Sequence, residues 1–144
     1  MIAVDTNILV YAHIGAMQRH ARAAAVLGEL GRSRAAWAIA WPCIHEFIAV
    51  VTNPRAFDPC LEVDEAIDAV RVLQGAPGLR LIGEGPGHLE ILARLLKRGG
   101  ARGGAVHDAR IAAICLAHEV GEIWTVDRDF LRFPGLRVRN PLVD

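Results

Sequence analysis

Short apolar segments rich in β-branched residues alternate along this chain with longer segments of helical periodicity. Residues 2–4, 37–39, 79–82, 123–126 and 136–138 are expected to form strands, with 79–82 at an edge of the sheet. A short helix or turn follows the first strand, and helices are expected over residues 16–30, 42–52, 62–73, 88–97 and 105–118, with Gly31 ending the first of these. This alternation is typical of parallel βαβ units. We therefore expect an α/β fold of three layers, in which helices flank a central parallel sheet.

The length and composition fit a single domain spanning residues 1–144. An apolar fraction of 53% argues against disorder, and the sequence lacks the roughly 18 uninterrupted apolar residues of a membrane span. Asp5 interrupts the first apolar run, so we expect no signal peptide. Cys43, Cys60 and Cys115 have no paired spacing, which predicts reduced thiols in a cytoplasmic protein, two of them in the core.

Two aspartates directly follow apolar strand segments. Asp5 comes after "IAV" and Asp127 after "IWTV". In an open parallel sheet the carboxyl ends of the strands lie at one edge, where ligands bind. Asp5 alone would be interpreted as a helix N-cap, but two aspartates at the same edge favour a functional site.

Two further acids fall near helix starts. Asp108 lies in the first turn of the helix over residues 105–118, beside its apolar stripe, and Glu46 lies in an otherwise apolar helix that begins near Pro42. Their structural explanations are a helix-dipole contact for Asp108 and the polar edge of an amphipathic helix for Glu46. A charge directed toward a core is costly unless it is paired or binds a cation, so we expect all four acids to form one site.

Four carboxylates without histidine partners predict a site for a hard cation. Oxygen ligands favour Mg²⁺, with Mn²⁺ as a substitute, over zinc. His45-Glu46 lacks the second histidine of the HExxH zinc motif, and we expect His45 at the surface or behind the ligands. Such an ion can activate water for attack on a phosphodiester.

The charges balance, with 16 basic and 16 acidic residues, but they are unevenly placed. Arg94, Lys97, Arg98, Arg102 and Arg110 surround Asp108, and glycines at 99, 100, 103 and 104 predict a mobile loop. Solvated surface and an ordinary flexible connection are the structural explanations. Because arginine suits phosphate recognition, we expect Arg98, Arg102 and Arg110 to contact the backbone phosphates of a nucleic acid.

Three segments resemble the PIN-domain ribonucleases, specifically the VapC-type toxins of bacterial toxin–antitoxin pairs. They are "VDTNILVYA", "CIHEF" and "HDARIAAICLAHEVGEIWTVDRDFLRFPGLRVRNPL", which occur in the family's order over nearly the whole chain. The resemblance implies Mg²⁺-dependent cleavage of RNA, often transfer RNA, by an acidic quartet of Asp5, Glu46, Asp108 and Asp127. It also implies a homodimer and a cognate VapB-type antitoxin that blocks the site.

The resemblance further assigns supporting roles to neighbours of the quartet. Thr6 and Thr125 would orient carboxylates or water, and Asp129 would be an auxiliary acid or a structural residue. The position at a strand end favours Asp127 over Asp129 as the nearer metal ligand.

Three alternatives make different demands on the same residues. A haloacid-dehalogenase-like phosphatase needs an aspartate where this chain has Asn7, and an HD-type phosphohydrolase would be all-helical. The third is a module that binds RNA and inhibits translation without cleaving it.

Overall fold

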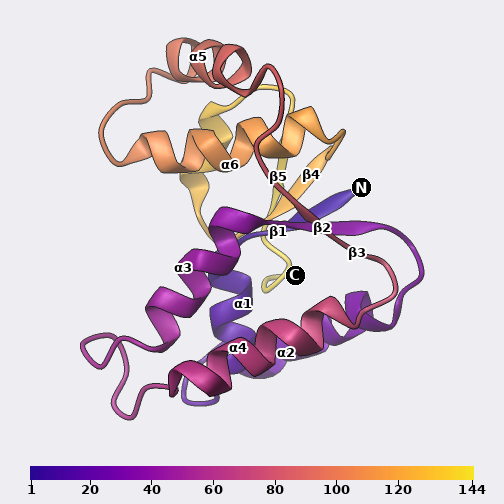
Figure 1. The fold of residues 1–144 in the computed structure, drawn as a ribbon, viewed down its shortest axis with the longest axis vertical. Coiled ribbons are helices and arrows are strands. Elements are labelled where there is room, and N and C mark those ends of the chain that lie inside the picture. The colour runs from indigo at the N-terminus through magenta and orange to yellow at the C-terminus, as the bar shows by residue number, and fades with distance from the viewer.

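Five parallel strands form one sheet in the order β3-β2-β1-β4-β5 (Figure 1). The structure, a computed structural model, describes residues 1–144. The strands are β1 (Ile2–Val4), β2 (Trp37–Ala40), β3 (Leu79–Ile82), β4 (Glu122–Trp124) and β5 (Arg137–Arg139). The expected central parallel sheet is confirmed, and it excludes the all-helical alternative.

Six α-helices cover the two faces of the sheet. They are α1 (Thr6–His13), α2 (His20–Arg32), α3 (Trp41–Val51), α4 (Val63–Gln74), α5 (His88–Gly99) and α6 (Ala105–Ala117), with a 3₁₀-helix η1 (Arg128–Arg132) between β4 and β5. The first four gather on one side of the sheet, and α5 and α6 lie together on the other (Figure 1). The three-layer expectation is therefore confirmed. None of the helices has the length and hydrophobicity that crossing a bilayer requires.

The element boundaries follow local chemistry. Pro42 lies in the first turn of α3, where its missing N–H leaves no helical hydrogen bond unmade. Gly31, expected to end α2, lies inside that helix instead, and Ser33 is the C-cap. Gly100 ends α5 at φ 58°, a left-handed conformation that favours glycine.

The core lies on both sides of the central strands. All four residues of β2 are buried, and so are the aromatic rings of Phe47, Phe130 and Phe133. Cys43 and Cys115 are free thiols in this core, as expected from their apolar surroundings. Burial and the nearby Asp5 carboxylate raise the pKa of Cys43, and the same two causes raise that of Cys115 to about 12. Both thiols therefore stay protonated at neutral pH.

The register of β1 and β4 sets the position of the candidate site. Val4 pairs with Trp124, and the Asp5 amide donates a hydrogen bond to the Trp124 carbonyl at 3.0 Å. The chain adds β2 and then β3 on one side of β1, and it then adds β4 and β5 on the other side. The carboxyl ends of β1 and β4 thus lie at the topological switch point, where ligands bind in open α/β sheets.

Candidate active site

Asp5 is the most buried of the acids, with 5% of its surface exposed. It is the N-cap of α1 and accepts the Thr6 amide on Oδ1 at 2.8 Å, so the capping interpretation is correct. The thiol of Cys43 also donates to Oδ1, at 3.6 Å. Oδ2 accepts hydrogen bonds from Asn7 and Thr125 at 2.9 and 2.7 Å. Four donors therefore fix this carboxylate.

Thr125 and Asn7 join the ends of β1 and β4. The Thr125 hydroxyl donates to Asp5 and accepts from the Asn7 amide at 2.9 Å and from the Asp127 amide at 3.0 Å. The Asn7 carbonyl oxygen accepts the Val126 amide at 3.2 Å. The backbone amides of Val126 and Asp127 thus donate to side chains, whereas in a longer strand they would pair with a neighbouring strand. This explains why β4 ends at Trp124, two residues before the expected end.

Glu46 reaches the same region from α3. Its carboxylate accepts a hydrogen bond from the Thr6 hydroxyl at 2.9 Å, across 40 positions of sequence. Unlike Asp5, Glu46 is exposed. Thr6 therefore links two acids, through its amide to Asp5 and through its hydroxyl to Glu46.

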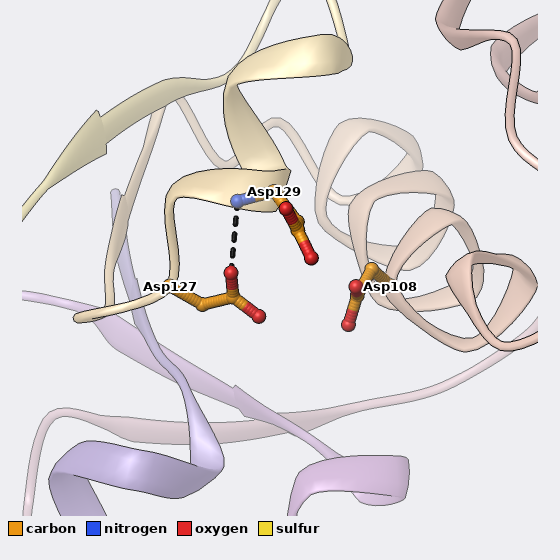
Figure 2. A group of neighbouring side chains, drawn as sticks. All are labelled: Asp108, Asp127 and Asp129. Carbon is orange, nitrogen blue, oxygen red and sulfur yellow. Dashed lines mark hydrogen bonds between the residues drawn. The ribbon is translucent and has the colours of Figure 1, made fainter.

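Three aspartates form the tightest group of acids. One ligand oxygen from each of Asp108, Asp127 and Asp129 lies within 4.8 Å of the others, and the side chains point into one gap between α6 and η1 (Figure 2). Asp127 caps η1 by accepting the Asp129 amide at 2.8 Å. Asp129 is therefore a full member of this group, and the strand-end argument, which favoured Asp127, does not separate the two.

The proximity of these acids changes their protonation. Burial, and then the negative charges of Asp127, Asp5, Asp129 and Glu46, raise the pKa of Asp108 to about 6. Burial also raises the pKa of Asp5, although hydrogen bonds from Thr125, Thr6 and Cys43 oppose that rise. Without a cation the site therefore has more negative charge than its surroundings stabilise.

The acids open into a central pocket of about 310 Å³. Asp5, Glu46, Asp108 and Asp127 all line it, so the structure brings the four expected acids together. Its remaining wall comes from α1, α3 and the segments after them: Thr6, Asn7, Val10, Tyr11, Met17, Val50 and Phe57. The pocket is thus acidic at the sheet edge and apolar beyond it.

The arginines expected to contact RNA have different environments. Arg110 lines a second hollow beside Glu46 and Asp108, but its guanidinium forms an ion pair with Glu84 and lowers the pKa of that carboxyl. Arg98 and Arg102 are exposed near the end of α5 and line neither hollow. His45 is exposed, as expected.

Asn7 is the site residue that the sequence analysis missed. In the sequence Asn7 is notable only as the position where a haloacid-dehalogenase-like phosphatase would need an aspartate. The available signal was its place two residues after Asp5, where the first turn of a capped helix returns its side chain to the strand ends. In the structure Asn7 is a hydrogen-bond donor to Asp5, which leaves no acid at that position for a phosphatase.

Comparison with known proteins identifies one family. Residues 2–136 match the family described as PIN domain. Ribonuclease VapC43 of Mycobacterium tuberculosis is 34% identical over 143 residues, which cover 99% of this chain and 96% of the relative. Ribonuclease VapC33 of the same organism is 31% identical over 142 residues, covering 99% of each chain.

Solved structures share the fold at lower identity. VapC20 of M. tuberculosis, described as a Sarcin-Ricin loop cleaving toxin, superposes with a TM-score of 0.69 at 18% identity, over 95% of this chain and 99% of that chain. VapBC2 from Rickettsia felis, bound to a DNA fragment from its promoter, gives a TM-score of 0.68 at 21% identity, over 97% and 98%.

Proposed function

The chain belongs to the PIN-domain family, with VapC ribonucleases among its relatives, and on this premise we propose that it is a metal-dependent endoribonuclease, the toxin of a toxin–antitoxin pair. The observation that supports this most directly is the convergence of Asp5, Glu46, Asp108 and Asp127 on one pocket, with Asp129 beside them. A purely structural role for these acids would not gather like charges.

The donor set fits a hard divalent cation. Carboxylate oxygens of three aspartates converge at the gap in Figure 2, and their spacing is small enough for them to share one ion. Burial and four neighbouring carboxylates raise the pKa of Asp108, and a divalent cation bound here would offset the repulsion among these charges. Mg²⁺, or Mn²⁺ in its place, would be held by Asp108 and Asp127, with Asp129, Asp5 and Glu46 as the further acids.

The bound ion would supply charge stabilisation for a phosphodiester under attack by water. The residues of the chain have separate tasks around it. The Asp5 carboxylate is held in place by four hydrogen-bond donors and supplies negative charge at the sheet edge of the pocket. Glu46, exposed and oriented by Thr6, accepts the proton of the attacking water.

The substrate and partners follow from the relatives. We propose RNA as the substrate, with transfer RNA as the first class to test. Ribosomal RNA is the second, because VapC20 is described as a Sarcin-Ricin loop cleaving toxin. A VapB-type antitoxin is the proposed inhibitor, since one structural neighbour is described as a toxin–antitoxin complex from Klebsiella pneumoniae. A homodimer is the proposed assembly.

The deciding experiment is a cleavage assay on end-labelled transfer RNA with antitoxin-free protein, in Mg²⁺, in Mn²⁺ and in EDTA. We expect discrete products that require metal and that fall by about a thousandfold or more in Asp108→Asn. Asp64→Asn is the matched control, because Asp64 also lies in the first turn of a helix but is exposed and lines neither hollow beside Asp108. Equal cleavage by the two variants would contradict the proposal, and RNA binding without cleavage by the native protein would favour a binding module.

A further inference from the structure

A third hollow, of about 490 Å³, shares Asp127 with the central pocket. It lies between the start of α2, the segment after β4, η1 and the C-terminal tail. Its lining includes Asp127, Arg19, Arg128 and Asn140, together with the apolar side chains of Leu131 and Val143. The shared Asp127 makes this hollow a continuation of the acidic site.

Its charge is opposite to that of the central pocket. Arg19 and Arg128 are both exposed and form no ion pair or side-chain hydrogen bond within the chain, whereas Arg110, near Asp108, is paired with Glu84. Among the side chains that line the hollow, two free guanidinium groups accompany one carboxylate, so the lining carries a net positive charge. Arginine forks in this state are suited to a phosphate.

Asn140 adds a neutral donor that is fixed in orientation. Its Oδ1 accepts the Leu142 amide at 2.9 Å, so its amide nitrogen points away from that turn and has no hydrogen-bond acceptor within the chain. Arg22 of α2 donates to the Pro141 carbonyl at 3.1 Å and holds this tail in place. The wall that presents the amide is therefore anchored to a helix.

The apolar part of the lining distinguishes a nucleotide from a free inorganic anion. Leu131 is 66% exposed and Val143 is 52% exposed, and both are among the few large hydrophobic side chains on the surface. Exposed apolar side chains beside unpaired arginines match a ribose and base next to a phosphate better than they match inorganic phosphate.

We propose that this hollow, the Arg19–Arg128 subsite, binds the backbone phosphate of a nucleotide next to the scissile phosphate of the RNA. The assignment of RNA rests on the proposed function. The strand would then pass over Asp127 from the central pocket toward Asn140. The acids would act on one phosphate while the arginines hold a neighbour, which fixes the register of the cut.

The test is the salt dependence of RNA binding. Asp108→Asn protein and a labelled short single-stranded RNA are titrated by fluorescence anisotropy in Mg²⁺, from about 50 to 200 mM KCl. Adding Arg19→Ala and Arg128→Ala is expected to weaken binding by about tenfold and to reduce the slope of log K against log salt by about 0.7, the contribution of one single-strand phosphate contact.

A matched double variant removes equal charge elsewhere. Arg34 precedes β2 and Arg80 lies on β3, the opposite edge strand, and both are exposed without an ion partner. Arg34→Ala with Arg80→Ala is expected to leave the slope unchanged. Equal slopes for the two double variants would overturn the proposal.

Asn140 has a matched control of its own. Asn53 accepts the Arg55 amide at 2.9 Å in the same kind of turn, and it is exposed outside the hollow. Asn140→Asp keeps its turn but places a negative charge where the phosphate would lie, so binding is expected to weaken severalfold. Asn53→Asp should have no effect, and equal affinities would remove Asn140 from the subsite.

The two proposals can fail separately. If the native protein cleaves no RNA, the nuclease proposal is wrong, whatever the salt slopes of binding are. If the native protein cleaves RNA but the Arg19→Ala, Arg128→Ala variant has the same KM as the Arg34→Ala, Arg80→Ala variant, the subsite proposal is wrong. We expect the first of these to raise KM while kcat at saturating RNA changes little.

Discussion

The amide nitrogen of Asn7 lies 2.9 Å from the hydroxyl oxygen of Thr125, although 118 positions separate the two residues in sequence. Both also donate to Oδ2 of Asp5. The first helix and the fourth strand are therefore joined through the carboxylate of an acid in the site. The stability of the fold and the orientation of the Asp5 carboxylate therefore both depend on the side chains of Asn7 and Thr125.

Replacing Thr125 by valine should show this dependence. The change preserves shape but removes the hydroxyl that serves Asp5, Asn7 and Asp127, all in a buried or half-buried setting. We expect the free energy of unfolding to fall by about 1–3 kcal/mol, the cost of leaving buried polar groups unpaired, and RNA cleavage to fall with it. Urea unfolding and the cleavage assay measure the two effects.

Thr125→Ser is the control, because it restores the hydroxyl and removes only a methyl group. It should recover most of the cleavage activity. If valine and serine behaved alike, packing rather than hydrogen bonding would explain the effect.

The pH dependence of stability should report the repulsion at Asp108. Its pKa is about 6 in the folded protein against 3.8 ordinarily, so the folded state holds a proton that the unfolded state has lost between these values. The contribution of Asp108 to the free energy of unfolding of the metal-free protein should therefore be largest below about pH 4 and should be lost as the pH rises through about 6. Because Asp108 is partly solvated, we expect a decrease of about 1 kcal/mol at most.

Asp108→Asn isolates this contribution. It should be more stable than the native protein above pH 6, and its stability should change less between pH 4 and 6. Asp5, whose raised pKa acts in the same direction, is present in both proteins, so the difference reports Asp108 together with its repulsion by Asp5. Parallel stability curves for the two proteins would show that Asp108 is not under strain from its neighbours.

Metal binding should stabilise the fold and should require Asp129 as well as Asp127. At a concentration about 100-fold above its Kd, Mg²⁺ is expected to stabilise the protein by about 2.7 kcal/mol, which raises the Tm by roughly 5–10 °C. Since both acids offer oxygens to the same gap, Asp127→Asn and Asp129→Asn should each reduce this rise. Thermal scans with Mg²⁺ and with EDTA measure it.

Asp64→Asn is again the control and should keep the full rise. A full rise in Asp129→Asn would assign Asp129 a structural role only and leave Asp127 as the nearer ligand.

Two glycines should respond oppositely to alanine. A Cβ at Gly78, just before β3, would lie 2.2 Å from the Ala35 carbonyl oxygen, and backbone cannot move aside cheaply there. Gly78→Ala should therefore lower the free energy of unfolding by about 2 kcal/mol or more. Gly31 lies within α2 with open space at its Cβ position, so Gly31→Ala should raise it by about 0.5–1 kcal/mol. Urea unfolding of both variants tests the close approach of the β2 and β3 strand starts.

Periodicity predicted most of the fold because the strands are short and buried. The edge strand over residues 79–82 matches β3, and the helices of the second half begin within one residue of their expected starts. The segment expected as a short helix or turn is the helix α1, in which Ile8, Leu9 and Val10 are all buried. A helix buried around consecutive positions shows no amphipathic stripe, so its pattern resembles a strand.

The acids could be predicted from the sequence, but their surroundings could not. Strand ends and helix starts can be recognised in the sequence, and they indicated Asp5, Asp108 and Asp127. The pairing of Arg110 with Glu84, 26 positions away, depends on how the segment after β3 lies against α6. Likewise, the unpaired state of Arg19 and Arg128 is a property of the folded surface and has no sequence signature.

The capping role of Asp5 affects how distant sequences are compared. An aspartate that ends a strand, starts a helix and receives four hydrogen bonds would be retained by selection for folding alone, even in a descendant that had lost catalysis. Asp108 contributes no such bond and is opposed by four neighbouring charges, so only use of the site would preserve it. In an alignment of related chains, the position of Asp5 would therefore trace ancestry, whereas the position of Asp108 would separate working enzymes from inactive ones.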